Sequence, residues 1–279
     1  MPAIGFSFVC PAHKSLTEMK VITSRDNSIY KSAQRLLRKK YRDEQGMYLM
    51  EGVKPLRDAI DTGIGIEKVF ICEGTGAEKE LAGWTDAEDR QVFLSRSLFD
   101  KLSETETSQG IIAVARKNQP DEEAFAKASE GKGLIVLDRL QDPGNLGTII
   151  RTAEAAGYGG LILVKGSADS YAPKVVRAAA GSLFRMPILQ VQSAEETIKL
   201  LRKLGRRIVV TYLEGGLNCF DAELRPADAI VIGNEGQGVS QDFADAADVR
   251  VIIPMEGQIE SLNAAVAAGI LMYISTNKR

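Results

Sequence analysis

The sequence has little that could form a disulfide framework or a metal site. Only three cysteines occur, Cys10, Cys72 and Cys219, and they lie far apart with no Cys-x-x-Cys pair. The one histidine, His13, has no candidate metal ligand near it, which also argues against a histidine-based catalytic triad. Sparse, unpaired cysteines are typical of a reducing compartment. We therefore expect a cytoplasmic protein without a metal centre.

Long apolar segments are also missing. No run of about 18 apolar residues occurs, so we expect no membrane-spanning helix. Residues 1–10 are mildly apolar, but they are too short and too uncharged for a secretory signal peptide. We interpret residues 1–18 as a leader or extension ahead of a natural start near Met19.

The chain has no excess of positive charge. Its 279 residues include 35 Lys and Arg against 37 Asp and Glu, a net charge of −2. Because the phosphates of nucleic acid are bound by positive charge, this balance at first argues against a nucleic-acid partner. The 44% hydrophobic and 26% charged content is that of a globular protein and excludes a disordered or fibrous one. The length fits one large domain or two of moderate size.

The positive charge that is present gathers in residues 27–42, NSIYKSAQRLLRKKYR. Six basic residues and no acidic one lie there, whereas 29 basic residues face 37 acidic ones elsewhere. Apolar residues at helical spacing predict one amphipathic helix with a basic outer face, which is either a solvated surface or an RNA-binding surface. We favour RNA binding. The residues that we expect to contact RNA are Arg25, Lys39, Lys40 and Arg42.

The first part of the chain has the pattern of a small α/β domain. Strands are predicted at 47–51, 68–71, 91–94 and 111–115, with helices at 54–62 and 97–101. The polar stretch 116–132 breaks this pattern and is interpreted as a linker that is partly helical. The predicted domain limits are 19–117 and 133–279, with the linker at 118–132.

The second part alternates more regularly between strands and helices. Short apolar runs predict strands at 134–137, 161–164, 208–212, 230–232 and 251–253, and helices are predicted at 146–156, 173–182, 194–204 and 264–275. Continuous apolar runs are typical of strands covered on both faces, which predicts a mostly parallel sheet. Ligands of such folds bind beyond the carboxyl ends of the strands. We therefore expect the chemistry in the segments that follow these strands.

The first such segment is LDRLQDPGNLGTIIRTAEAAG, residues 137–157. Asn145 could cap the helix that follows the turn. Arg151 does not belong to the apolar face of that helix, so its side chain can point away from the core. Taken alone, this is also what a turn before a helix with a surface arginine looks like.

The second segment is AIVIGNEGQGVS, residues 229–240, in which a strand runs into a glycine-rich turn. Its spacing fits neither the dinucleotide fingerprint nor a P-loop. A small-molecule nucleotide-binding enzyme is thus disfavoured, and a sharp turn with no ligand is the alternative.

The third segment, residues 251–274, places Ser261, Leu262 and Asn263 before a helix of very small residues. The alternative here is a core helix with Ser261 or Asn263 as its N-cap.

In their residues and in their order along the chain, these three segments resemble the motifs of the SpoU (TrmH-type) branch of the SPOUT RNA methyltransferases. Asn145 and Arg151 match its Asn-then-Arg motif, and 233–236 matches its Gly-x-Glu-Gly motif. Ile-Pro-Met at 253–255 and Ser-Leu-Asn at 261–263 match the third. The resemblance covers 134–274, including 173–187. Residues 19–115 resemble, more loosely, a ribosomal-protein-like substrate-binding domain, which typically ends as TSQGIIAVA does at 107–115.

The resemblance implies a deep trefoil knot near the C-terminus of the α/β fold. It also implies S-adenosylmethionine as cofactor, held largely by main chain of the knot loops. By motif position, Gly233, Ile253 and Leu262 are the expected cofactor contacts. The family works as a homodimer with the active site near the subunit interface, so a second copy is an expected partner.

The implied reaction is methylation of a ribose 2′-hydroxyl in RNA. We favour 23S ribosomal RNA because compact tRNA-acting relatives often lack the N-terminal domain. The alternatives are a tRNA 2′-O-ribose methyltransferase and a catalytically silent RNA-binding protein. The expected catalytic residues are Asn145, Arg151, Glu235, Ser261 and Asn263.

Arg151 is a poor base, because the pKa of an arginine is above about 12. We expect it to bind the adjacent phosphate and to steady the developing oxyanion, which leaves the proton acceptor open.

Overall fold

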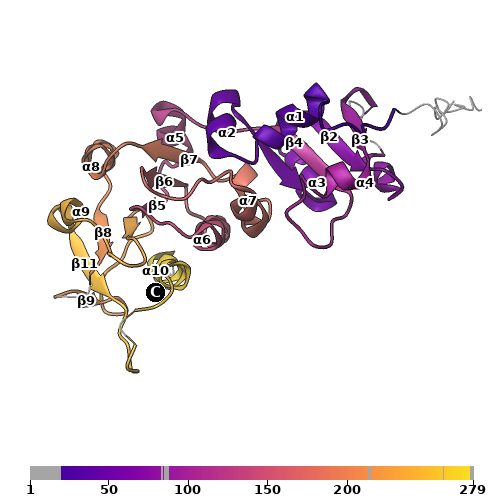
Figure 1. Cartoon of the computed structure of the whole chain (residues 1–279). Coiled ribbons are helices and arrows are strands. Elements are labelled where there is room, and N and C mark those ends of the chain that lie inside the picture. Colours follow the sequence, from indigo (N-terminus) through magenta and orange to yellow (C-terminus); the bar gives the residue numbers. More distant parts are fainter. Residues whose placement is uncertain (1–19, 83, 85–87, 213–214, 260, 277–279) are drawn as a thin grey trace, which may run out of the picture.

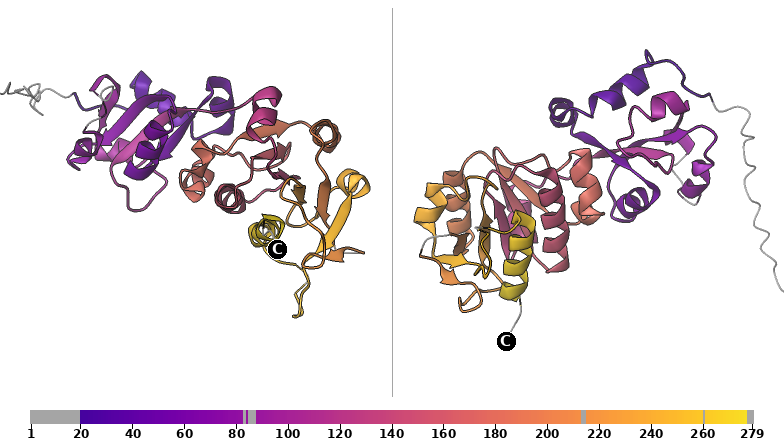
Figure 2. Two further views of the ribbon diagram at one scale, coloured as in Figure 1. Left: turned by 180° about the vertical axis from the view of Figure 1, so that it is seen from behind. Right: turned by 60° about the horizontal axis from the view of Figure 1, so that its bottom comes forward.

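The computed structural model describes residues 20–82, 84, 88–212, 215–259 and 261–276. The predicted leader, 1–18, lies outside the described residues. Two β-sheets, each with its own helices, lie side by side (Figures 1 and 2). We refer to residues 20–116 as the N-terminal unit and to residues 121–276 as the C-terminal unit.

The N-terminal unit is built on a four-stranded sheet in the order β1-β4-β2-β3. Strand β4 is antiparallel to β1 and β2, and β3 is parallel to β2, so β1, β2 and β3 share one direction. The elements are α1 (Ser28–Arg35), α2 (Lys39–Gln45), β1 (Met47–Glu51), α3 (Val53–Asp61), β2 (Ile66–Cys72), η2 (Ala77–Leu81), η3 (Glu88–Arg90), β3 (Gln91–Leu94), α4 (Arg96–Phe99) and β4 (Ile111–Arg116). All four strands and both helices predicted for this part are present.

The single basic helix predicted over 27–42 is wrong, because the segment forms two helices. Asn27 is the N-cap of α1 and accepts from the N–H groups of Ile29 and Tyr30. The chain is extended at Arg38, which precedes α2. The buried Leu36 ends α1, and its carbonyl accepts a hydrogen bond from Arg42 Nη1 at 2.7 Å. A side-chain donor thus replaces the backbone donor that a continuous helix would supply.

The C-terminal unit contains a seven-stranded sheet in the order β7-β6-β5-β10-β8-β11-β9, with every pair parallel. This confirms the predicted α/β fold with a mostly parallel sheet. Its elements are α5 (Glu122–Ala128), β5 (Leu134–Leu137), α6 (Pro143–Ala155), β6 (Gly160–Val164), α7 (Pro173–Ala179), η4 (Ser182–Phe184), β7 (Ile188–Val191), α8 (Ala194–Lys203), β8 (Ile208–Thr211), β9 (Leu217–Asn218), β10 (Ala229–Ile232), α9 (Gln241–Ala246), β11 (Val249–Ile252) and α10 (Ala264–Thr276). Of these, β7, β9 and α9 were not predicted from the sequence.

Helices α5, α8 and α9 pack on one face of this sheet, and α6, α7 and α10 pack on the other (Figure 1). Alternate residues of β5 point to opposite faces: Leu134 and Val136 pack with α5, α8 and α9, whereas Ile135 and Leu137 pack with α6, α7 and α10. Part of the predicted linker is therefore core, because Phe125 of α5 is fully buried. A Cβ on Gly160 of β6 would lie 2.6 Å from its ring, so a glycine is needed beneath it.

The two units share one hydrophobic core. The cluster on the α6–α7 face continues into β1, β2 and β4 of the N-terminal unit. At the junction the rings of Tyr48 and Tyr171 lie 4.8 Å apart between centroids. The Tyr171 hydroxyl donates to the carbonyl of Asn118 at 2.6 Å. Because burial of this surface requires both units, their packing is part of the fold.

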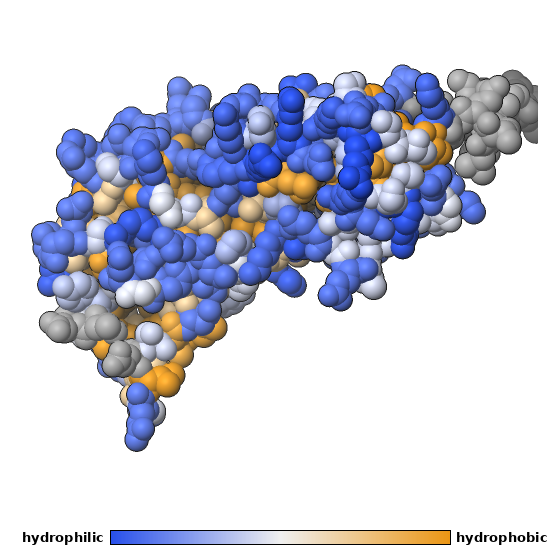
Figure 3. All heavy atoms as spheres, in the orientation of Figure 1, coloured by the Kyte–Doolittle hydropathy of each residue, from blue (hydrophilic) through white to orange (hydrophobic). Residues whose placement is uncertain are grey.

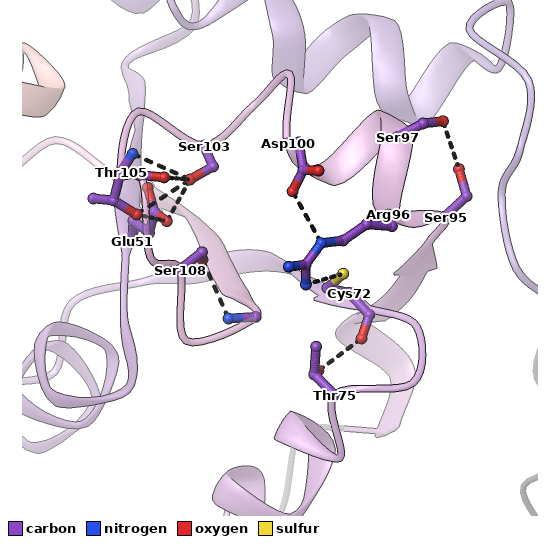
Figure 4. Close-up of polar contacts among 11 residues, drawn as sticks. Glu51, Cys72, Thr75, Ser95, Arg96, Ser97, Asp100, Ser103, Thr105 and Ser108 are labelled. Atoms are coloured by element: carbon purple, nitrogen blue, oxygen red, sulfur yellow. Dashed lines mark hydrogen bonds and ion pairs between the residues drawn. The ribbon is translucent and has the colours of Figure 1, made fainter.

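The loop that follows α4 is held to β1 by polar contacts within the N-terminal unit (Figure 4). The Glu51 carboxylate accepts from the hydroxyls of Ser103 and Thr105 at 2.7 and 2.6 Å. Between them, Glu104 reaches Arg177 of α7 at 3.4 Å. The loop that follows α4 is thus held to β1 and to the C-terminal unit.

Candidate active site

Three loops lie at the carboxyl edge of the parallel sheet, where the chemistry was expected. They follow β5, β10 and β11 and comprise, among the described residues, 138–142, 233–240, 253–259 and 261–263. Strands β5 and β10 are direct neighbours, so the first two loops start side by side.

The carboxylate of Glu235 joins the first two loops. It accepts hydrogen bonds from the N–H groups of Gln141 and Asp142, both at 3.1 Å. Its third donor is the side-chain amide of Asn145, also at 3.1 Å. One carboxylate therefore fixes the turn between β5 and α6 against the glycine-rich loop.

These donors determine the charge state of Glu235. Partial burial, the largest single effect, raises its pKa, but the hydrogen bonds from Gln141, Asn145 and Asp142 together outweigh it. The pKa of Glu235 is thus lowered, and the group is a carboxylate at neutral pH.

The N-cap of α6 is Asp142, and the prediction that Asn145 caps this helix is wrong. The Asp142 carboxylate accepts from the N–H of Asn145 at 2.7 Å, and Pro143 occupies the first helical position. This contact lowers the pKa of Asp142. The side chain of Asn145 is thereby available to contact Glu235 from the first turn of α6. An aspartate directly before a proline is the sequence signal for this cap.

Asn263 adds the third loop to the network. Its Nδ2 donates to Asn145 Oδ1 at 2.8 Å, while its Oδ1 accepts from the N–H groups of Ala265 and Val266. It therefore caps α10, as the alternative interpretation predicted, and also contacts Asn145. Ser261 is exposed, and Ile253 and Leu262 are half-buried on the same loop.

The glycine-rich loop is folded tightly on itself. A Cβ on Gly233 would lie 2.2 Å from the carbonyl carbon of Gly238, and Gly238 has a φ of +68°. Asn234 bridges the loop to its neighbour, since its Nδ2 donates to the carbonyl of Arg139 at 2.9 Å and its Oδ1 accepts from Gly236 and Gln237. Asn234 lies inside the Gly-x-Glu-Gly motif but was not among the predicted site residues. An asparagine in a glycine turn is the available signal.

Arg151 lies apart from this network. Its side chain is exposed on α6, and it makes no hydrogen bond or ion pair with any residue in the described part of the chain. The structure therefore brings together Asn145, Glu235 and Asn263 but leaves Arg151 free to contact another molecule.

The predicted RNA-binding residues fall into two groups. Arg25, Lys39 and Lys40 are exposed, and the two lysines pair with Asp43 and Glu44 on the next turn of α2. Figure 3 shows a hydrophilic surface over this helix.

Arg42 is the exception, and its assignment to RNA is wrong. The side chain is 4% exposed and donates Nε and Nη2 to Asp169 Oδ2 at 2.9 and 2.7 Å. A guanidinium enclosed in this way cannot reach a phosphate, so Arg42 instead connects α2 to the C-terminal unit.

None of the helices in the described part of the chain has the length and apolarity needed to cross a lipid bilayer. Among the same residues, no group of three or more His, Cys, Asp or Glu side chains could hold a metal ion. Cys72 and Cys219 are buried as free thiols.

The fold and the site define an α/β protein with a ligand site at the carboxyl edge of a parallel sheet, attached to a second unit with an exposed basic helix. Residues 132–273 match the SpoU rRNA Methylase family, and residues 27–113 match the MRM3-like substrate binding domain. The chain belongs to the SpoU rRNA methylase family.

Relatives match over almost the whole chain. The 23S rRNA (guanosine(2553)-2′-O)-methyltransferase RlmP of Bacillus subtilis is 33% identical over 255 residues, covering 91% of this chain and 98% of the relative. An rRNA methyltransferase from Sinorhizobium meliloti, solved with bound AdoMet, has a TM-score of 0.81 and 31% identity, covering 92% of this chain and 97% of the other. The SpoU methyltransferase AviRb from Streptomyces viridochromogenes, also solved with AdoMet, has a TM-score of 0.80 and 31% identity over 90% and 97% of the two chains.

The residues of the site fit S-adenosylmethionine, the cofactor of this family. A carboxylate that remains ionised, Glu235, is a favourable neighbour for a sulfonium cation. The half-buried aliphatic side chains of Ile253 and Leu262 offer apolar contact to an adenine ring. The closely folded main chain around Gly233 leaves no room for a side chain at this position.

Replacing Glu235 with glutamine tests whether its carboxylate holds the loops after β5 and β10 together. A carboxylate with a lowered pKa contributes stability that is complete above about pH 5 and is lost as the pH falls through that lowered pKa. We expect Glu235→Gln to lower the free energy of unfolding at pH 7 by about 1 kcal/mol, a modest value because the carboxylate is partly exposed. Urea unfolding of the variant should also depend less on pH between about 5 and 3. If the free energy of unfolding depended on pH in the same way in the variant and in the wild type, this role of Glu235 would be contradicted.

Proposed function

We propose that this protein transfers a methyl group from S-adenosylmethionine to a ribose 2′-hydroxyl of RNA, with 23S ribosomal RNA as the substrate. The observation that carries the proposal is the hydrogen-bonded contact among Asn145, Glu235 and Asn263, one residue from each family motif. The match of residues 27–113 to a substrate-binding domain and the name of the RlmP relative favour ribosomal RNA over tRNA.

When bound, S-adenosylmethionine supplies an electrophilic methyl group on a positively charged sulfur. The residues of the chain must then hold the ribose hydroxyl in line with that methyl group. The Asn145–Glu235–Asn263 network is polar. We assign it, together with Ser261 on the same loop as Asn263, to orienting ribose and cofactor. Gly233, Ile253 and Leu262 are assigned to holding the cofactor.

Arg151 is assigned to the substrate. Its five N–H donors match a phosphate in planar, bidentate fashion. It binds the phosphate next to the reacting ribose and steadies the oxyanion that develops as the proton leaves.

Replacement of this arginine separates chemistry from cofactor binding. We expect Arg151→Ala to reduce methyl transfer about a hundredfold or more, as for removal of one oxyanion donor, with the affinity for S-adenosylmethionine unchanged. The measurement is incorporation of labelled methyl groups into RNA, together with a cofactor titration. Arg202→Ala on α8, at the far face of the sheet, is the control and should retain the wild-type rate. Wild-type transfer by Arg151→Ala would refute the assignment.

Lys39 and Lys40 on the exposed side of α2 are assigned to binding the RNA backbone, together with Arg25. Release of counterions from bound phosphates makes such binding depend on salt. We expect Lys39→Ala/Lys40→Ala to weaken RNA binding and to reduce the slope of log affinity against log salt by about one for each phosphate that the variant no longer binds.

The control for this test removes the same charge elsewhere. Lys199→Ala/Lys203→Ala lies on α8, and we expect it to keep the wild-type slope. Equal salt slopes for the α2 variant and the wild type would exclude α2 from the RNA surface.

We further propose that the protein is a homodimer that pairs through α10. Its side chains Val266 and Tyr273, seven residues apart on one face, are 50% and 54% exposed. Figure 3 shows an apolar area over this helix. Helix α10 also packs against α6, which carries Arg151, so a dimer formed here would bring that arginine near the second subunit. We propose a trefoil knot at the loops after β10 and β11, because α10 follows them and returns to pack on α6 and β10.

Charged residues on this face should separate the subunits. We expect the wild type to sediment as a dimer at micromolar concentration and Val266→Asp/Tyr273→Asp to sediment as a monomer, because burying unpaired carboxylates at an interface is costly. Ile29→Asp, at an exposed apolar position of α1, is the control and should leave the dimer intact. A monomeric wild type or a dimeric double variant would contradict the assignment.

The proposal also includes the cellular compartment and the domain limits. The buried free thiols fit a reducing compartment, and we place the enzyme in the cytoplasm. We propose 19–117 and 133–279 as its two domains, connected by 118–132, in which helix α5 packs on the second domain.

A further inference from the structure

We propose that the buried ion pair between Arg42 and Asp169 is a positioning device that sets the Glu235-bound turn relative to the RNA-binding face of α2. The inference rests on the proposed function. Neither residue would contact RNA or cofactor. Their effect is exerted through the loop 165–172, which joins β6 to α7.

The ion pair is enclosed at the junction of the two units, where α2 of the N-terminal unit faces the C-terminal unit (Figure 1). The side chains of Arg42 and Asp169 are 4% and 6% exposed. The guanidinium uses all three of its nitrogens, two on Asp169 Oδ2 and one on the carbonyl of Leu36. It therefore fixes α1, α2 and the loop 165–172 to one another.

From Asp169, short contacts lead to the turn before α6. The N–H of Ala168 donates to the carbonyl of Leu140 at 2.7 Å, and the Ser167 hydroxyl donates to the carbonyl of Leu137 at 3.0 Å. Leu140 is fully buried, so this turn cannot shift without moving the loop. The next two residues, Gln141 and Asp142, donate their N–H groups to Glu235.

The exposed surface of α2 carries Lys39 and Lys40. Arg42 is thus on the helix that we assign to the RNA backbone, and its partner is on the loop that supports the site. A shift between these parts would misplace the ribose relative to the methyl group, and errors of about 1 Å are sufficient to slow such reactions greatly.

The test removes both charges together, because removal of one alone would leave an uncompensated buried charge. In Arg42→Met/Asp169→Asn the asparagine can still accept from the N–H of Tyr171, as Asp169 Oδ1 does at 3.0 Å. The control, Arg177→Met/Glu104→Gln, removes a different ion pair between the units, which is partly exposed and does not involve the loop 165–172.

Two readouts are taken on each protein. The first is amide hydrogen exchange of a peptide spanning 138–142, which has no contact with Arg42; we expect about tenfold faster exchange in the test variant and no change in the control. The second is single-turnover methyl transfer; we expect a rate about tenfold lower, with RNA and S-adenosylmethionine affinities within twofold of wild type. A purely structural role would lower the melting temperature and weaken both affinities together.

Wild-type exchange at 138–142 in the test variant would overturn the proposal, and so would a wild-type transfer rate. A wild-type protein that transfers no methyl group would refute the proposed function instead, while the exchange experiment would still decide whether the ion pair holds the turn.

Discussion

The hydrogen bonds accepted by the Glu235 carboxylate are the constraint on which the site depends. They hold the turn before α6 against the loop after β10, and through Asn145 they extend to Asn263 at the start of α10. Loops that come together only at the edge of a sheet have no hydrophobic core of their own. A charged acceptor with several donors can hold them because charge-assisted hydrogen bonds are stronger than neutral ones. The same bonds keep the group ionised, so the structural role and the electrostatic role are carried by one residue.

The second constraint is the continuous core between the two units. A substrate-binding domain joined by a flexible linker could present RNA to the site in many orientations. Here Phe125 anchors α5 in the C-terminal unit, and Tyr48 packs on Tyr171 across the junction. Together with the enclosed Arg42–Asp169 pair, these contacts keep the basic helix at a defined position. Selection of the target nucleotide then depends on a fixed geometry, because RNA is recognised largely through its shape and its unpaired regions.

Much of this architecture was accessible from the sequence, and the exceptions have physical causes. Buried strands such as 134–137 are continuous apolar runs, which identify them directly. Strand β9 has only two residues and gives no periodic signal. Asn145 was predicted as a cap because asparagine favours that position, but Asp142 before Pro143 caps better. Arg42 looked like its neighbours Lys39 and Lys40, because burial and a partner 127 residues away cannot be read from local sequence. The motif residues Asn145, Glu235 and Asn263 were identified, but their mutual contacts required the fold.

The central claim is that this site methylates a ribose hydroxyl and not a base. The most direct measurement is to label 23S ribosomal RNA with tritiated S-adenosylmethionine and this protein, and then to hydrolyse the RNA with alkali. Alkaline cleavage requires the 2′-oxygen as nucleophile, so a 2′-O-methyl group protects the following phosphodiester bond. We predict label in alkali-resistant dinucleotides from one position. Label in mononucleotides, which would indicate base methylation, or no label at all would contradict the claim.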